Sequence, residues 1–497
     1  MKHIFPFCAL LFSFLWANNL QVSNISLGNL NSSSGFVMVE FDIRWENSWR
    51  ISTGPANWDA AWVFIKFSKN SGAWEHASLN YVDGTAANDG HIQAAGATLT
   101  TPADGKGIFV YRDAVGNGSF SAADIQLRWN YALDGVNLAD LLDIQVHAVE
   151  MVYVPQGAFS VGDGSSSSAF YAYPSTTDPY AISSENAITV GTNTGDLNYA
   201  SNFFSTHGDQ LGPIPNAFPK GFGAFYCMKY EATHDQWVAF FNTLDATQKS
   251  LHDLTDIDHK NTNAVVQRNT VLWSGTGDAT TATPDRPVGY MHPRDALAYL
   301  DWAALRPMTE FEFEKACRGP QTPVSGEFAW GNANLGNDFF AIFDDGLPTE
   351  NVFDFTPGDG NANWALVSTW GDGPLRAGIF AASVSTKNRV ETGATYYGIM
   401  EMSGNLEEFV ITPGRPEGRA FTGNHGDGLL AANGAANESS WPAQTGWAGN
   451  GHRGGSYKST NALFFTMSGR FFPARASFTS SALNSPEWGV RGIRTAP

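Results

Sequence analysis

Alternating apolar and polar residues predict strands in the first part of the chain. Over residues 36–45, every second side chain is apolar and most of those between are polar, which is typical of a strand with one buried face. Residues 125–131 repeat the alternation, and the apolar runs 62–67 and 108–111 are further strands. Clusters of Gly, Asn and Asp between these runs indicate turns. We therefore expect residues 18–148 to form an all-β, sandwich-like domain.

Capping patterns predict helices in the middle of the chain. Thr233 with Gln236, and Thr309 with Glu312, have the spacing of a capping box, in which each side chain bonds the other residue's backbone amide. Between them, residues 295–305 are predicted to form a third helix. The rest of the chain is rich in Gly, Asn and aromatic residues and contains short strand patterns. This combination favours an α+β fold over a doubly wound sheet.

Two segments follow neither pattern. Residues 160–221 are rich in Ser, Thr, Asn, Gly and Pro without periodicity, so we expect a long surface insertion there. Residues 1–17 have the form of a signal peptide, since Lys2 and His3 precede an apolar run that ends near the small Ala17. We expect the protein to be secreted, periplasmic or at the cell surface; a buried N-terminal strand is the alternative. No later segment is apolar for long enough to predict a transmembrane helix.

Composition restricts the possible partners and the chemistry. The 497 residues are too many for one ordinary core, so more than one domain is expected. The chain has 48 acidic and 29 basic residues and a net charge of −19, which disfavours nucleic acid as a partner. Beyond the signal segment, Cys227 and Cys317 are the remaining cysteines, too few for a disulfide framework and without zinc-site spacing. One disulfide and two buried thiols both remain open.

Eight short motifs occur in the chain after residue 150. They are MVYVPQGAF at 151–159, YCMKYEATHDQW at 226–237, RPV at 286–288, RPMTEFEFE at 306–314, FAWG at 328–331, YGIMEMSGNLEE at 397–408, HRGGSY at 452–457 and WGVR at 488–491. In this order they resemble the formylglycine-generating enzyme, or sulfatase-modifying factor, family. The resemblance implies that residues 149–497 form that family's domain, a variant of the C-type lectin fold.

The resemblance also implies calcium at the turn in the motif at 397–408. The ligands would be the side chains of Glu401 and Glu408 and the carbonyl oxygens of Gly404 and Leu406. Calcium takes six to eight oxygen ligands, and a turn offers backbone carbonyls as well as side chains. The family usually has Asn or Asp at the position of Glu401, so a salt-bridged turn is the alternative.

A second calcium site of the family maps loosely onto the region after residue 359. Its ligands would be Asn363, the carbonyl of Trp364, Asp372 and the carbonyl of Pro374. The spacing is shorter here than in the family, and a plain Asn/Gly turn is the alternative.

The family's catalytic copper has no cysteine ligands in this sequence. True members bind copper with two cysteines that follow the Arg-Gly-Gly-Ser motif, because Cu(I) requires soft thiolates. By position those cysteines become Ser459 and Phe464, and no cysteine lies beyond Cys317. The eleven histidines are scattered, without the cluster of a related iron enzyme. We therefore expect no copper and no formylglycine-generating activity.

Aromatic residues interleaved with Ser, Thr and Asn near the C-terminus predict a recognition surface, although for any single ring the core is the alternative. The candidate binding residues are Tyr457, Ser459, Phe464, Phe472 and Trp488. We expect Arg470, Arg491 and Arg494 to brace the fold through carbonyls and carboxylates. The leading hypothesis is an exported, non-catalytic protein that binds an unknown protein or glycan. The alternatives are an oxidoreductase of the same superfamily that modifies an exported protein, and a cell-surface scaffold.

Overall fold

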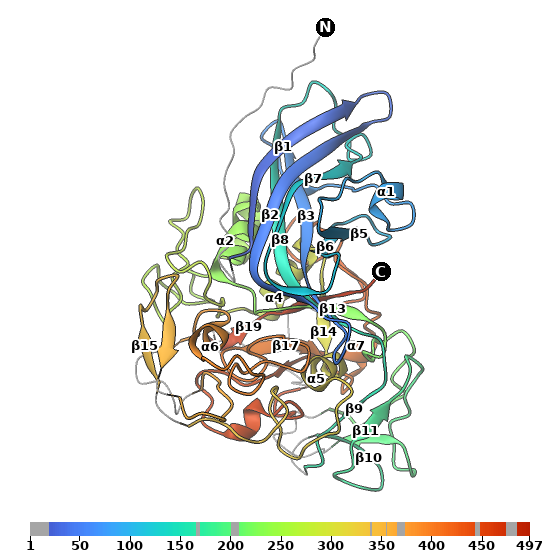
Figure 1. Cartoon of the computed structure of the whole chain (residues 1–497), viewed down its shortest axis with the longest axis vertical. Coiled ribbons are helices and arrows are strands. Elements are labelled where there is room, and N and C mark those ends of the chain that lie inside the picture. The colour runs from blue at the N-terminus through green and yellow to red at the C-terminus, as the bar shows by residue number, and fades with distance from the viewer. Residues whose placement is uncertain are drawn as a thin grey trace.

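The computed structural model describes residues 19–165, 169–199, 208–337, 340–353, 355–364, 373–442, 448–473 and 485–497. In these residues the fold is mixed α+β, mostly strands with few helices, as Figure 1 shows. The predicted signal peptide lies outside them. None of the described helices is both long and apolar enough to cross a membrane.

Two sheets face each other across a core in the N-terminal part, and the larger one continues into the C-terminal part. The smaller one is antiparallel and has the order β1 (Gln21–Asn31), β2 (Phe36–Arg50), β7 (Gly116–Trp129). The larger one has the order β18-β17-β14-β20-β13-β8-β3-β6-β5, with β4 beside β3 and β19 beside β17. Its strands are β3 (Asp59–Lys69), β4 (Trp74–His76), β5 (Ala97–Thr100), β6 (Ile108–Arg112), β8 (Leu142–Val154), β13 (Phe225–Met228), β14 (Arg306–Thr309), β17 (Glu407–Ile411), β18 (Asn450–Arg453), β19 (Trp488–Gly489) and β20 (Gly492–Thr495).

Strand β8 belongs to both parts of the chain. Its residues 142–152 pair with β3, and its last residues 151–154 pair with β13, antiparallel in both cases. The domain boundary expected at residue 148 therefore falls inside a strand. The reason is that both parts contribute strands to one hydrogen-bonded sheet, and a strand cannot be divided without breaking its pairing.

Strand β3 is buried on both faces. Ala61, Val63, Ile65 and Phe67 belong to the core between the two sheets. Ala60, Trp62 and Phe64 belong to a second core, which includes helices α2 (His234–Asn242) and α4 (Pro293–Trp302). This explains why residues 60–65 of the strand are all apolar rather than alternating with polar residues.

The described helices are short, and several begin where the capping patterns predicted. The capping boxes at Thr233 and Thr309 are formed and start α2 (His234–Asn242) and α5 (Glu310–Arg318). The helix expected over 295–305 is α4 (Pro293–Trp302), which starts with proline in its first turn. It stops early because Ala304 has a φ of 54°, outside the helical region.

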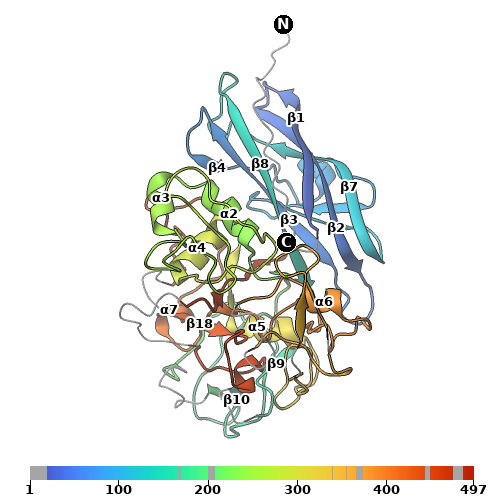
Figure 2. The ribbon, with the colours of Figure 1, turned by 90° about the vertical axis from the view of Figure 1, so that its left-hand side faces the viewer.

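The other described helices are α1 (Ala86–Asp89), α3 (Ala246–Leu251), α6 (Ile379–Ser383), α7 (Pro416–Arg419) and the 3₁₀ turn at Ala462–Phe465. Figure 2 shows α2, α3 and α4 gathered on one side of the molecule.

The segment expected to be a surface insertion also contributes to the core. It holds two antiparallel pairs, β9 (Phe159–Val161) with β11 (Tyr180–Ile182), and β10 (Phe170–Ala172) with β12 (Leu197–Tyr199). Phe170 is fully buried, and its ring centroid lies 4.9 Å from that of Phe311 in α5. Strands of three residues are too short to show a period, which is why the sequence pattern missed them. A further short pair is formed by β15 (Ala341–Phe343) and β16 (Asn351–Phe353).

Candidate functional site

Helix α5 is the centre of a buried ionic frame. Its three glutamates are each at most 1 % exposed. Each pairs with an arginine from another segment at N–O distances of 2.6–3.0 Å: Glu310 with Arg470, Glu312 with Arg306, and Glu314 with Arg453. Charge-assisted pairs of this kind fix orientation, because a buried charge without its partner is strongly unfavourable. The bracing role predicted for Arg470 is confirmed.

Arg491 and Arg494 also brace the fold. Arg491 donates to the carbonyls of Met228 and Met400, both at 2.8 Å. Arg494 donates to the carbonyl of Ala304 and forms an ion pair with Asp104. Because Asp104 lies in the N-terminal part, this pair joins distant segments of the chain, as strand β8 does.

Three glutamates are buried together around Arg491. Glu408 binds the guanidinium through Oε1, at 2.8 Å from Nε and 2.7 Å from Nη2, and Glu401 Oε1 accepts from the Gly378 amide at 2.9 Å. Glu231 accepts hydrogen bonds from the Asn405 side chain at 2.6 Å and from a backbone amide at 2.8 Å. Burial raises the pKa of all three carboxyl groups, that of Glu401 to about 7.

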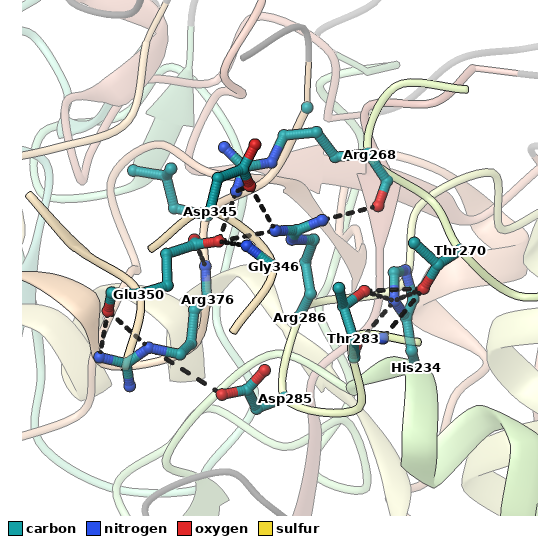
Figure 3. A network of polar contacts seen from close by, with 12 residues as sticks. His234, Arg268, Thr270, Thr283, Asp285, Arg286, Asp345, Gly346, Glu350 and Arg376 are labelled. Atoms are coloured by element: carbon teal, nitrogen blue, oxygen red, sulfur yellow. Dashed lines mark hydrogen bonds and ion pairs between the residues drawn. The ribbon is translucent and has the colours of Figure 1, made fainter. Parts of the chain in front are cut away.

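A second ionic network surrounds Glu350, as Figure 3 shows. The Nη2 atoms of Arg268 and Arg286 each lie 2.7 Å from Glu350 Oε2, and Arg376 donates to the Glu350 backbone carbonyl at 2.9 and 2.7 Å. Burial favours the neutral acid, but the two guanidinium groups outweigh it and hold the pKa of Glu350 below its ordinary value. Asp345, largely exposed, accepts from the same two arginines at 2.7 and 3.1 Å. Sequence reasoning missed this network.

Two histidines converge on the buried carboxylate of Asp295, near the start of α4. His252 Nδ1 lies 2.8 Å from Asp295 Oδ1, and His259 Nε2 lies 3.0 Å from Oδ2. The other ring nitrogen of His259 lies 2.8 Å from Asp256. Burial disfavours the imidazolium, but the two aspartates prevail and raise the pKa of His259 to about 9. His259 therefore carries a charge at neutral pH.

The charge on His259 predicts a pH-dependent stability. Its folded-state pKa of about 9 exceeds the ordinary value of 6.5, so its contribution is complete below pH 6.5 and is lost as pH rises through 9. We expect the contribution of His259 to the free energy of unfolding to fall by about 2–3 kcal/mol over this range, since one pKa unit is worth about 1.4 kcal/mol. Urea unfolding at a series of pH values measures it. His259→Gln should flatten the profile, whereas His425→Gln should not, because burial holds the pKa of His425 well below 6.5.

The family is identified from the long C-terminal part of the chain. The family profile described as the sulfatase-modifying factor enzyme 1-like domain matches residues 143–496. The chain belongs to this family. The match begins within β8, next to the shared strand pairing described above. No curated protein matches the chain in sequence.

Ser459 and Phe464, the positions predicted to correspond to the family's cysteine pair, carry packed side chains. Ser459 is 7 % exposed, and its hydroxyl accepts from the Ser456 amide at 3.1 Å. Phe464 is half-buried, with its ring centroid 4.8 Å from that of Phe471. The two cysteines of the described part, Cys227 and Cys317, are buried free thiols, and burial raises the pKa of both. A raised thiol pKa disfavours the thiolate that binds soft metals.

The predicted first calcium set lies in the glutamate cluster. Glu401 Oε2 and Glu408 Oε2 are buried and have no hydrogen-bond partner among the described residues. The turn between them includes Gly404 and Leu406, whose amide donates to Glu231 at 2.8 Å. Glu231 itself was not predicted, although it lies in the motif at 226–237. Its carboxylate accepts hydrogen bonds from this turn and is the third carboxylate of the glutamate cluster.

The second predicted set lies beside the first. The Asn363 side-chain amide donates to Asn405 Oδ1 at 3.1 Å and to the Gly373 carbonyl at 3.2 Å. Its Oδ1 is buried without a partner in the described part of the chain. Trp364 and Pro374 are buried next to it, whereas Asp372 lies outside the described residues. In the described ranges, no group of three or more His, Cys, Asp or Glu residues is arranged to hold a metal ion.

The predicted binding residues are mostly packed inside. Tyr457 and Trp488 are 3 % and 5 % exposed. The Tyr457 hydroxyl donates to Gln267 Oε1 at 3.1 Å, and the Trp488 ring lies 5.0 Å from that of His452. Ser459 is also buried. Phe464 and Phe472 are half-buried, and their ring centroids lie 5.8 Å apart. Tyr457, Ser459 and Trp488 therefore contribute to packing.

Proposed function

We propose that the protein is an exported, non-catalytic ligand-binding member of the sulfatase-modifying factor family. Its family domain is a variant of the C-type lectin fold, and the two facing sheets of its N-terminal part form a sandwich. The observation that carries the proposal is that no cysteine follows Cys317 in the sequence, so Ser459 and Phe464 stand where the resemblance predicts the family's copper ligands. A hydroxyl and a phenyl ring cannot replace thiolates for Cu(I).

The remaining thiols do not restore that chemistry. Cys227 lies on β13 and Cys317 on α5, both in an apolar core with no exposed surface. The cleft that a peptide substrate needs would have to open through that core. The surrounding ion pairs of α5 are fully buried, which favours a rigid frame over a reactive centre.

Incubation with copper, oxygen and a cysteine-containing sulfatase peptide tests the proposal. We expect no oxidation of the peptide cysteine by mass spectrometry, with an active family enzyme as the positive control. Turnover by the wild-type chain would overturn the non-catalytic function. Repeating the assay with Cys227→Ser and Cys317→Ser together would then show whether those thiols are responsible.

We further propose that the domain binds calcium. The donor chemistry fits, because the partnerless oxygens of Glu401 and Glu408 are buried and hard. These side chains, with the carbonyls of Gly404 and Leu406, would hold the ion. Its charge would offset buried carboxylates that Arg491 alone does not neutralise.

Calcium is therefore expected to raise the melting temperature of the protein. At a free concentration 100 times the Kd the stabilisation is about 2.7 kcal/mol. Scanning calorimetry with calcium and with a chelator measures the shift. Glu401→Gln should abolish it, whereas Glu417→Gln, at an exposed position, should leave it unchanged. A wild-type protein that melts at the same temperature with and without calcium would contradict the site.

A further inference from the structure

A cleft lies between the N-terminal sheets and the family domain. Its volume is about 490 Å³, which is within the range of small-ligand sites. One wall is the end of β2, with Trp49, and the other is the segment that leads into α6, from Arg376. None of the residues predicted from the sequence to bind a ligand lines it.

The floor of the cleft is apolar and made mainly of small side chains. Tyr230, Ala377, Ala394 and Met400 form a buried cluster there, with Ala381 packed against it. Small residues leave room above the floor, while Tyr230 and Trp49 supply aromatic surface. Aromatic side chains combine a large contact area with a polar group at one end, which suits ligands that are both apolar and polar.

A buried lysine lines the same cleft. Lys229 is 3 % exposed and lies 4.8 Å from the centroid of the Trp49 ring. Its ammonium is 3.4 Å from Glu150 and 3.8 Å from Asp59, longer than a strong hydrogen bond. The Tyr230 hydroxyl also interacts with this ammonium, so Lys229 contributes a positively charged part of the lining and helps to fix the Tyr230 side chain. The two carboxylates already balance its charge, so the site does not select an anion.

Arg376 and Asp285 are held in place at the rim by the network of Figure 3. Arg376 is fixed by its two bonds to the Glu350 carbonyl, and its Nε lies 3.9 Å from Asp285 Oδ2. The Asp285 carbonyl accepts from the Ala377 amide at 3.0 Å. The rim thus presents a donor and an acceptor whose positions do not depend on a ligand, which lowers the entropic cost of binding.

We propose that this cleft binds a neutral oligosaccharide. The proposal rests on the ligand-binding function proposed above and names its ligand class. The lining includes three cations and two anions, so its charges are nearly balanced; they are Lys229, Arg376, Lys387, Glu46 and Asp285. Hydroxyl groups both donate and accept, so a sugar can satisfy such mixed partners, whereas an anion would meet the carboxylates behind Lys229. An aromatic wall beside fixed polar groups completes the match.

Glycan arrays probed with the full chain test the proposal. The array should carry short neutral oligosaccharides, sulfated and sialylated ones, and linear peptides. We expect neutral sugars to bind, and Ala382→Trp, which obstructs the cleft, to weaken the best of them at least about tenfold in calorimetry. Ala382 lines the cleft and is exposed, so the variant should fold; its melting temperature checks this. Ala333→Trp, exposed and outside the cleft, should bind as the wild type does.

The outcomes separate the two proposals. Binding only of acidic glycans or of peptides, or binding that Ala382→Trp does not weaken, overturns the cleft assignment but leaves a ligand-binding function in place. A complete lack of binding to the array also overturns the cleft assignment. Copper-dependent turnover of the sulfatase peptide instead overturns the non-catalytic function.

Discussion

Replacing Arg470 with methionine is expected to lower the free energy of unfolding by about 3–5 kcal/mol. The guanidinium is fully buried and makes two 2.9 Å hydrogen bonds to Glu310. It also lies 3.9 Å from the Phe170 ring centroid and 4.6 Å from that of Tyr199. Methionine keeps much of the apolar stem but leaves the Glu310 carboxylate without its main partner. Urea denaturation followed by circular dichroism measures the loss.

Two controls isolate the charge. In the double variant Arg470→Met with Glu310→Gln the loss should be smaller, since no carboxylate is left buried without its main partner. Lys69→Met breaks an ion pair with Glu75 whose side chains are 32 % and 38 % exposed, and should cost less than about 1 kcal/mol. Equal losses from Arg470→Met and Lys69→Met would show that the buried ion pair contributes no more to the free energy of unfolding than the exposed one.

Local signals in the sequence predicted the secondary structure well. The alternation over residues 36–45 and 125–131 corresponds to β2 and β7, and both capping boxes start helices. Each of these signals depends on residues a few positions apart, so it can be recognised in the sequence without information on tertiary contacts. The family motifs are also short runs of neighbouring residues, and the family that they predicted is confirmed.

Pairing between distant segments could not be predicted from the same signals. Nothing in the residues of strand β8 shows that it pairs with β3 on one side and with β13 on the other. The boundary expected at residue 148 followed from the family motif that begins at Met151, not from strand pairing. The same limit explains the missed network, because Glu350 lies 82 positions from Arg268 and 64 from Arg286.

The candidate site was predicted in part. The motif at 397–408 brought Glu401 and Glu408 together, and the structure buries both beside Arg491. Glu231, 174 positions before Asn405, completes the cluster only through the fold. For each aromatic residue near the C-terminus the sequence left a recognition surface and the core as alternatives, and Tyr457 and Trp488 are packed inside. Composition alone does not tell which side of a ring faces solvent.

Trp62→Ala is expected to destabilise both parts of the chain together, by about 3–5 kcal/mol. The indole is fully buried on the face of β3 that packs against the family domain. It donates to the Ala303 carbonyl at 2.9 Å, and its ring lies 4.2 Å from the Arg494 guanidinium. The substitution leaves a cavity and removes the hydrogen bond to that carbonyl.

Because one sheet runs through both parts, unfolding should remain a single transition in the variant and in the wild type. Tryptophan fluorescence and far-ultraviolet circular dichroism should give coincident urea curves, both shifted to lower urea. Trp74→Ala, on the neighbouring strand β4 at a half-buried position, should shift them much less. Two separate transitions, only one of which moves in Trp62→Ala, would instead mean that the shared strand β8 does not couple the two parts.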